Sequence, residues 1–189
     1  SDARPIHFQG IGGAGMSALA ELCHRRGARV TGCDQNPDGA ADLRAIGIDA
    51  LRGHDPAHVE GHRALVVSSA IPKDHPEVLR AQALGLPVIR RAEALAEATA
   101  GGTLIGIAGT HGKSTTTVMT TEALAAAGKA PTGVVGARVS AWGGNLSRGG
   151  SDLFVVEADE YYRSFLALHP TVAVVTNVEA DHLDIYRDL

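Results

Sequence analysis

The sequence has few aromatic residues, only two cysteines and no long hydrophobic run. Aromatic residues make up 4% of its 189 residues, which argues against the stacking platforms that bind single-stranded nucleic acid. Its net charge of -4 also argues against a nucleic-acid surface. No apolar run approaches the roughly 18 residues that span a bilayer, and no export signal begins the sequence. We therefore expect a cytoplasmic protein with no membrane and no nucleic acid as partner. Its oligomeric state is left open.

The two cysteines, Cys23 and Cys33, show no spacing typical of a metal site. Cys23 falls on a predicted helix and Cys33 ends a predicted strand, so we expect both to be buried thiols without a disulfide. The nine histidines are scattered along the sequence, and we expect most of them to lie on the surface. The cysteines thus predict no metal centre.

Short apolar runs alternate with helical patterns through the first half of the chain. The runs are residues 6–8, 28–33, 64–70 and 86–89, and the helical patterns are residues 16–27, 41–47, 75–85 and 90–102. The first three helical patterns have apolar residues about 3.6 apart and end on a glycine, as helices often do. This alternation predicts an α/β fold, a Rossmann-like parallel sheet with crossover helices. The pair Gly101–Gly102 marks a domain boundary, so residues 1–100 form the first predicted domain.

The pattern restarts in a second predicted domain, residues 101–189. Strands are predicted at residues 103–110, 131–137, 151–159 and 171–181, a helix at residues 113–128, and a loop at residues 140–150. Two of these strands end in acidic or amide residues. Ligands of open parallel sheets bind at the carboxyl ends of strands, which is where these polar groups fall. The sequence stops shortly after a strand, and this second domain looks incomplete.

A glycine-rich turn follows the first predicted strand. Gly10, Gly12 and Gly15 fit the G-x-G-x-x-G spacing of a loop that holds a diphosphate at a helix N-terminus. In favour of a nicotinamide or flavin cofactor, Asp34 ends the next strand, where an acidic residue binds a ribose hydroxyl. An oxidoreductase that uses NAD or FAD and a protein that binds a different diphosphate therefore both remain open.

A second phosphate loop, "GTHGKS" at residues 109–114, lies between a predicted strand and a helix. The strict P-loop pattern would need a glycine at position 107, where this chain has Ile107. Small residues still let backbone N–H groups surround a phosphate at a helix N-terminus. Lys113 can neutralise the β- and γ-oxygens of a nucleotide, and the Ser114 hydroxyl can bind Mg²⁺. A dehydrogenase has no use for this second loop, whereas a P-loop switch protein would leave the first loop unexplained.

Acidic groups follow the last two predicted strands. They are Glu157, Asp159 and Glu160 after one strand, and Glu179, Asp181 and Asp184, with Asn177 and His182, after the other. Carboxylates beside a phosphate loop are natural ligands for Mg²⁺, which prefers hard oxygen atoms. Glu157 is the first such group after its strand and is the leading candidate ligand. The alternative is that these groups are solvated loop charges, which we favour for Asp184, and that Asp181 caps a helix.

Six segments, "GIGGAGMS", "VVSSAI", "GTHGKSTTT", "VEADE", "SFL" and "TNVEADHLD", occur in this order and resemble the Mur ligases. These are ATP-dependent amide-forming enzymes of peptidoglycan synthesis. The resemblance implies a Rossmann-like domain for a UDP-sugar, a P-loop domain for ATP and Mg²⁺, and a C-terminal ligase domain that the sequence lacks. It implies UDP-N-acetylmuramate and L-alanine as substrates. A member that attaches a ready-made tripeptide to the same nucleotide sugar remains an alternative.

The resemblance also implies roles for individual residues. The UDP-sugar would be bound by Gly12, Gly13, Ala14, Gly15, Ser17, Asp34, Ser68 and Ser69. ATP would be bound by Gly109, Thr110, His111, Gly112, Lys113, Ser114, Thr115 and Asn177. Mg²⁺ would be held by Ser114, Glu157 and His182, and Lys113, Glu157 and His182 would serve catalysis. The family usually has Asp where this chain has Tyr162, which leaves the role of that position open. Because a closing domain is missing, we expect this piece alone to have no ligase turnover.

Overall fold

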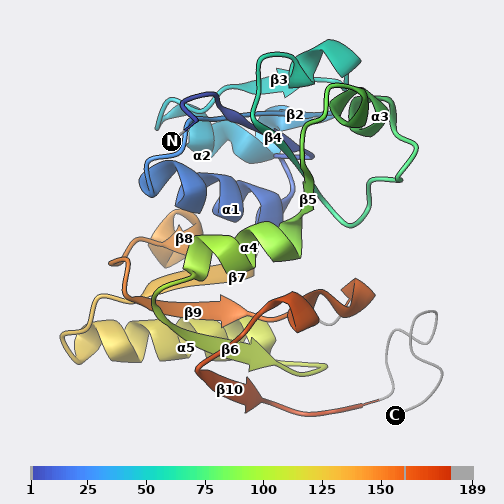
Figure 1. Cartoon of the computed structure of the whole chain (residues 1–189). Helices are drawn as coiled ribbons and strands as arrows, with labels where there is room; N and C mark the ends of the chain where they lie inside the picture. The colour runs from blue at the N-terminus through green and yellow to red at the C-terminus, as the bar shows by residue number, and fades with distance from the viewer. Residues whose placement is uncertain (1, 160, 180–189) are drawn as a thin grey trace. The chain divides into compact units, whose positions relative to one another are not determined.

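The computed structural model describes residues 2–159 and 161–179 of the chain. The fold divides into two compact units, Ser1–Ala94 and Leu95–Leu189. Each unit is built on its own sheet (Figure 1). None of the helices in the described ranges is both long and apolar enough to cross a membrane.

The first unit contains an open parallel sheet with the strand order β3-β2-β1-β4-β5. The strands are β1 (Ile6–Gln9), β2 (Val30–Asp34), β3 (Ala50–Arg52), β4 (Ala64–Val67) and β5 (Val88–Arg90). The helices are α1 (Ala14–Arg25), α2 (Ala41–Arg44), α3 (Pro76–Ala83) and α4 (Arg91–Thr99), and short 3-10 turns are η1 (Pro37–Ala40) and η2 (Pro56–Val59). Every strand pair in this sheet is parallel, which confirms the Rossmann-like prediction. The strand order reverses beside β1, where β2 and β4 flank it, and ligands of such sheets bind at this point.

The two faces of this sheet are covered differently. Figure 1 places α1 and α3 on opposite faces of the sheet. On the α3 face, Leu65 and Val67 of β4 pack with Val59, Val78 and Ala81 in a buried apolar cluster. Since burying one such side chain contributes roughly 1.5–3 kcal/mol, this cluster anchors α3 and η2 to the sheet.

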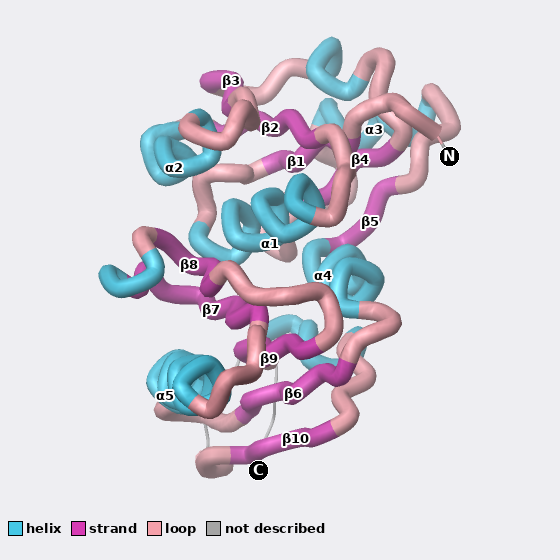
Figure 2. The backbone as a smooth tube through the Cα atoms, turned by 90° about the vertical axis from the view of Figure 1, so that its left-hand side faces the viewer, coloured by secondary structure: helices cyan, strands magenta, loops and turns pink. Residues whose placement is uncertain are grey.

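The second unit contains a mixed sheet with the strand order β10-β6-β9-β7-β8. Its strands are β6 (Thr103–Ala108), β7 (Thr132–Val139), β8 (Gly144–Ser147), β9 (Leu153–Glu157) and β10 (Val172–Val175). Helix α5 (Lys113–Ala126) follows β6, and 3-10 turns lie at η3 (Ser140–Trp142) and η4 (Tyr161–Ala167). Strands β6, β9, β10 and β7 pair in parallel, whereas β8 pairs with β7 in the antiparallel direction. Helix α5 contacts β6, β7 and β9, as the tube in Figure 2 shows from another side.

Two elements differ from the sequence prediction. The predicted loop at residues 140–150 contains β8, because the left-handed Gly143 (φ 68°) lets the chain turn back and pair with β7. Strand β3 was not predicted, because its three residues are too few to show a clear period of two. Both strands lie at sheet edges, so the predicted central topology is unaffected.

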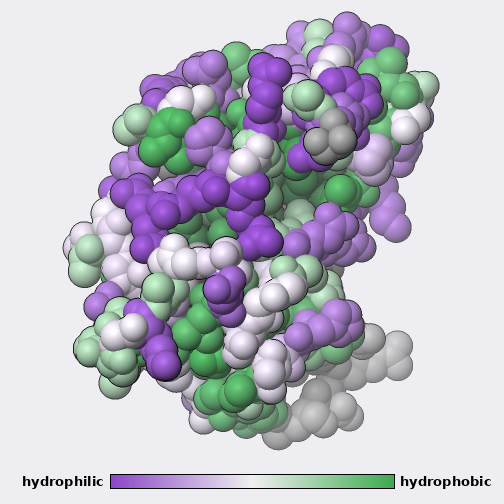
Figure 3. Space-filling model, turned by 60° about the vertical axis from the view of Figure 1, so that its left-hand side comes forward, coloured by the Kyte–Doolittle hydropathy of each residue, from purple (hydrophilic) through white to green (hydrophobic). Residues whose placement is uncertain are grey.

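The surface is mixed in character, as the space-filling view in Figure 3 illustrates for one face. Among the described residues, the exposed large apolar side chains include Met119, Val172, Val175 and Val178. Single exposed apolar residues are common on folded proteins and need no special explanation.

Candidate functional site

The glycine-rich turn of the first unit connects β1 to α1. Gly10 has a φ of +81°, a left-handed conformation that L side chains rarely adopt. Gly13 forms the N-cap of α1, and no side-chain hydrogen bond caps this helix end. Its first N–H groups therefore face the turn at the positive end of the helix dipole. Such a helix end is suited to a phosphate group.

Asp34 holds the glycine-rich turn from the end of the neighbouring strand β2. Its carboxylate accepts hydrogen bonds from the backbone N–H groups of Gly12 (2.9 Å) and Asn36 (2.9 Å). A Cβ on Gly12 would lie 2.8 Å from the Asn36 carbonyl oxygen, so only glycine fits there. The structure thus brings Asp34 to the turn. Here it binds the turn itself, rather than pointing away from it.

Other residues proposed for the UDP-sugar lie at differing positions around the turn. The Ser68 hydroxyl oxygen lies 3.8 Å from the place of a Cβ on Gly10, so Ser68 borders the turn, whereas Ser69 is exposed on the chain beyond it. The Ser17 hydroxyl donates to the carbonyl of Ala14 (3.0 Å) within α1. That bond satisfies the hydroxyl inside the helix rather than directing it at a ligand.

Arg91, at the start of α4, borders this turn, and Arg90 precedes it at the end of β5; neither was predicted from the sequence. The Arg91 guanidinium lies 3.1 Å from the place of a Cβ on Gly15, beside the first turn of α1. Arg90 donates to the carbonyls of Ser68 (3.2 Å) and Ile71 (3.1 Å) and fixes the segment after β4. Their place is set by the tertiary fold, since they lie some 75 residues after the turn in the sequence.

The second phosphate loop connects β6 to α5. Gly112 is the N-cap of α5 with a left-handed φ of 80°, and this helix end also has no side-chain cap. Gly109 has a φ of 132° and lies against Thr176. Lys113 folds back over the loop, and its ammonium donates to the carbonyls of Gly109 (2.7 Å) and Thr110 (3.1 Å). Lys113 and the loop backbone thus lie together at the N-terminus of α5, where the sequence predicts a phosphate.

Side chains of the segment that follows β10 hydrogen-bond to the backbone of this loop. The Asn177 side chain accepts from the His111 N–H (2.9 Å) and donates to the His111 carbonyl (3.0 Å). The Thr176 hydroxyl donates to the same carbonyl (2.6 Å). Asn177 therefore shapes the loop through the backbone of His111. Thr176 was missed by the sequence analysis, although it stands next to Asn177 in the sequence.

Glu157 lies at the end of β9, beside the start of α5. Its Oε2 accepts from the Ser114 hydroxyl (3.0 Å) and from the Gly136 N–H (2.7 Å). A hydroxyl and a carboxylate in contact are two hard oxygen ligands, the type that Mg²⁺ prefers. The residues present therefore fit a magnesium ion, and Gly136, which orients the carboxylate, was missed because a glycine in a strand gives no such signal.

Several other predicted residues are exposed or lie outside the described residues. Thr115 is exposed on the first turn of α5 and His111 is exposed in the loop. His182, Glu160, Asp181 and Asp184 lie outside the described residues, as does the side chain of Tyr162. The phosphate-loop residues that the structure does describe come together within the second unit, at the carboxyl ends of β6, β9 and β10.

Two α/β units, each with a glycine-containing loop at the N-terminus of an uncapped helix, have the backbone arrangement that is typical of phosphate-binding domains. The model of the Mur ligase family, catalytic domain, matches residues 5–103, and that of the Mur ligase middle domain matches residues 107–189. The chain belongs to the Mur ligase family.

Relatives with established names support this assignment. A UDP-N-acetylmuramate–L-alanine ligase of Frankia casuarinae is 48% identical over 97% of this chain and 38% of its own length. One of Methylibium petroleiphilum is 50% identical over 96% of this chain and 39% of its own length. This chain thus spans about two-fifths of the length of these relatives.

Solved structures of the family have the same fold. The UDP-N-acetylmuramate-alanine ligase of Thermotoga maritima superposes with a TM-score of 0.89 at 30% identity, over 98% of this chain and 44% of that chain. A UDP-N-acetylmuramate:L-alanyl-gamma-D-glutamyl-meso-diaminopimelate ligase from Neisseria meningitides gives a TM-score of 0.88 at 33% identity, over 98% of this chain and 64% of that chain. The Rossmann-like first domain and the P-loop-type second domain are therefore shared with known ligases.

Proposed function

We propose that this chain provides the UDP-sugar-binding and ATP-binding parts of a cytoplasmic ligase of peptidoglycan precursor synthesis. The first domain, residues 1–100, would bind UDP-N-acetylmuramate, and the second, residues 101–189, would bind ATP. The observation that supports this most is the contact between Ser114 and Glu157 beside a complete phosphate loop. An oxidoreductase that uses NAD or FAD at the first loop needs no such second site. The family assignment also favours the ligase.

The reaction that we propose is an ATP-dependent amide bond formation. The lactyl carboxylate of UDP-N-acetylmuramate would attack the γ-phosphate of ATP, forming an acyl phosphate and releasing ADP. The amine of L-alanine would then attack the activated carbonyl, forming the amide and releasing phosphate. No side-chain nucleophile is required, so the contribution of the protein is the alignment of two anions and an amine.

The residues of the second unit would act through electrostatics. The Lys113 ammonium, which now binds the loop carbonyls, would turn to the phosphate oxygens and stabilise charge on the transferred group. Ser114 and Glu157 would hold Mg²⁺, with His182 as a further proposed ligand. When bound, Mg²⁺ would neutralise part of the negative charge of the nucleotide phosphates.

The amine substrate distinguishes two members of the family. The relatives at 48% and 50% identity bear the name of the L-alanine ligase, and this favours L-alanine. The ligase from Neisseria meningitides, whose name specifies a tripeptide, supports the tripeptide as the second candidate. Both candidates share the same nucleotide sugar.

Calorimetry with this 189-residue chain tests the two binding sites. We expect UDP-N-acetylmuramate to bind and NAD to bind much more weakly. Lys113→Ala should weaken the binding of Mg²⁺-ATP and leave the binding of the UDP-sugar unchanged, whereas the control Lys129→Ala, at an exposed position after α5, should change neither. Tight binding of NAD without binding of the UDP-sugar would refute the proposal, and so would an equal loss of both ligands in Lys113→Ala.

A further inference from the structure

A polar cluster lies within the first unit, beside the glycine-rich turn, since the Cys33 carbonyl accepts from the Gly10 N–H (2.8 Å). In the parallel register of β1 and β2, His7 is opposite Thr31 and Gln9 is opposite Cys33. Because side chains alternate along a strand, these four residues face the same side of the sheet. His7, Gln9 and Cys33 are 0% exposed. Central strands of parallel sheets usually have apolar residues on both faces, so this polar face needs an explanation.

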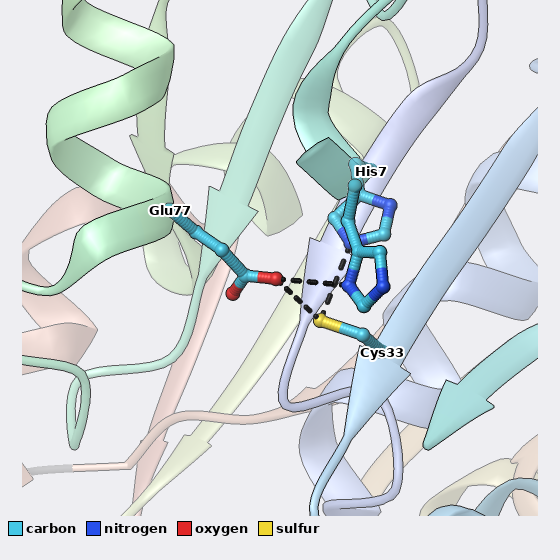
Figure 4. A group of neighbouring side chains, drawn as sticks. His7, Cys33 and Glu77 are labelled. Atoms are coloured by element: carbon cyan, nitrogen blue, oxygen red, sulfur yellow. Dashed lines mark hydrogen bonds and ion pairs between the residues drawn. The ribbon is translucent and has the colours of Figure 1, made fainter. Parts of the chain in front are cut away.

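Two elements above that face complete the cluster. Glu77 on α3 and His58 on η2 meet His7 and Cys33, with their ligand atoms all within 4.8 Å of one another. The His7 Nε2 lies 3.3 Å from the Cys33 sulfur, and the sulfur lies 3.1 Å from Glu77 Oε1. The His58 Nδ1 lies 3.2 Å from the same oxygen. Figure 4 shows His7, Cys33 and Glu77 pointing toward one common place from three different elements.

Glu77 is a buried carboxylate without a strong cationic partner in the described part of the chain. Its side chain is 0% exposed and its Oε2 makes no hydrogen bond, although the His54 Nδ1 lies 3.3 Å away. Within the described residues, its ion-pair contacts are to the rings of His54, His58 and His75. Burying a carboxylate is costly unless a charge and hydrogen bonds compensate it. Because Oε1 of this buried carboxylate faces Cys33 and His58, a cation in the cluster would compensate its charge.

We propose that His7, Cys33, His58 and Glu77 bind one zinc ion inside the first unit. Two imidazoles, a thiolate and a carboxylate are ligands that zinc uses in proteins. Zinc–ligand bonds of about 2.0–2.3 Å place the ligand atoms of a tetrahedron roughly 3.3–3.8 Å apart. Three of the six ligand pairs are 3.1–3.3 Å apart, and all six lie within 4.8 Å. The thiolate and the carboxylate together balance the two positive charges of the ion.

The orientation of one ligand also agrees with this assignment. Thr31 holds the other nitrogen of His7, since its Oγ1 lies 2.9 Å from Nδ1 and 2.7 Å from the His62 Nε2. Such support is typical of metal-bound histidines.

The site would have a structural role. Its ligands come from β1, β2, η2 and α3, and four protein ligands leave no open position for a substrate. The His58 side chain is 19% exposed while Glu77 is fully buried, so the ion has an entry path beside His58. The ion would tie α3 and η2 to the centre of the sheet. This inference does not rest on the proposed ligase function, because none of the four ligand side chains belongs to either phosphate loop.

Metal uptake by the tag-free 189-residue chain tests the proposal. After removal of metals with a chelator, we expect one equivalent of Zn²⁺ to bind per chain by elemental analysis. Co²⁺ in its place should give the intense visible bands of a tetrahedral site and a near-ultraviolet sulfur-to-cobalt charge-transfer band. Zn²⁺ at a hundredfold excess over its Kd should raise the Tm of the first unit by about 10 °C or more.

Variants assign the ligands. Cys33→Ser should abolish the charge-transfer band, whereas Cys23→Ser, the matched control on α1, should keep it. His58→Ala should weaken Zn²⁺ binding strongly, and the control His169→Ala at an exposed position should not. Thr31→Val should weaken binding about 10–100-fold, as loss of a partner behind a metal-bound histidine does. If the wild-type chain does not take up stoichiometric Zn²⁺, the proposal is overturned, whether or not the variants fold. A charge-transfer band that depends on Cys23 would also overturn it.

Discussion

Alanine substitutions at two glycines of the second phosphate loop can separate two costs to the free energy of unfolding: that of an unusual backbone conformation and that of a steric clash. Both Gly109 (φ 132°) and Gly112 (φ 80°) have a positive φ. A Cβ on Gly112 would meet nothing within 4 Å, whereas a Cβ on Gly109 would lie 2.1 Å from the Thr176 hydroxyl and 3.0 Å from the Thr176 nitrogen. Alanine at either position therefore introduces strain, and only Gly109→Ala must also push a neighbour aside.

The magnitudes follow from these contacts. The conformational cost of an L side chain at positive φ is about 1–2 kcal/mol and applies to both variants. In Gly109→Ala the displaced Thr176 hydroxyl also loses its bonds to the carbonyls of Ala108 (3.2 Å) and His111 (2.6 Å), at about 1 kcal/mol each. We expect Gly112→Ala to destabilise the second unit by about 1–2 kcal/mol, and Gly109→Ala by about 3–4 kcal/mol.

The fluorescence of Trp142 can measure the difference in stability between the Gly109→Ala and Gly112→Ala variants. It is the single tryptophan of the chain and lies in the second unit, where its indole N–H donates to Glu122. Its fluorescence during urea denaturation should report the unfolding of that unit. Thr176→Ala removes the clashing hydroxyl, so the double variant with Gly109→Ala should lose less stability than the sum of the two single variants. Equal stabilities of the Gly109→Ala and Gly112→Ala variants, or strict additivity in the double variant, would refute the clash.

Two further substitutions test how the loops use their acidic neighbours. Glu157→Gln should weaken ATP binding about tenfold or more in the presence of Mg²⁺, because it removes a charged oxygen beside Ser114. In the presence of a chelator, the same substitution should leave ATP binding unchanged. An equal loss of ATP binding in both conditions, measured by calorimetry, would argue against Glu157 as a metal ligand. Asp34→Ala should lower the stability of the first unit by about 1.5–3 kcal/mol in urea denaturation followed by circular dichroism, since the Gly12 N–H loses a charged acceptor. The exposed Asp38→Ala should cost about 0–1 kcal/mol, and a similar loss in both aspartate variants would contradict this role.

The parallel architecture could be predicted from the sequence because its signals are local. Apolar runs such as residues 64–70 and helices that end on glycine follow one another, and the structure confirms this alternation. Edge strands were harder to predict, since β8 pairs with only one neighbour and its sequence, Gly-Asn-Leu-Ser, has one apolar residue. Its pairing depends on β7 and the turn at Gly143, and this is tertiary information.

The histidine prediction was wrong for a similar reason. Of the eight histidines that the structure describes, only His111 and His169 are exposed, and His7 is fully buried. The expectation of a buried thiol was confirmed for Cys33 and was wrong for Cys23, which is half-buried. No spacing signal could have shown that Cys33 lies beside Glu77, because the residues of the cluster are spread over four elements between positions 7 and 77. Their proximity is created by the sheet and by α3.

The two phosphate loops are shaped in the same physical way, although their sequences differ. In each loop a side chain that follows a neighbouring strand hydrogen-bonds the loop backbone: Asp34 binds Gly12, and Asn177 binds His111. In each loop the N-cap residue of the following helix is glycine, without a side-chain cap. A capping side chain would occupy the N–H groups that an anion needs. The neighbouring strand therefore supplies the rigidity, and the helix end keeps its donors for the phosphate. If the loops bind phosphate as we propose, Asp34 and Asn177 would influence that ligand through the shape of the loop, even without contact to it.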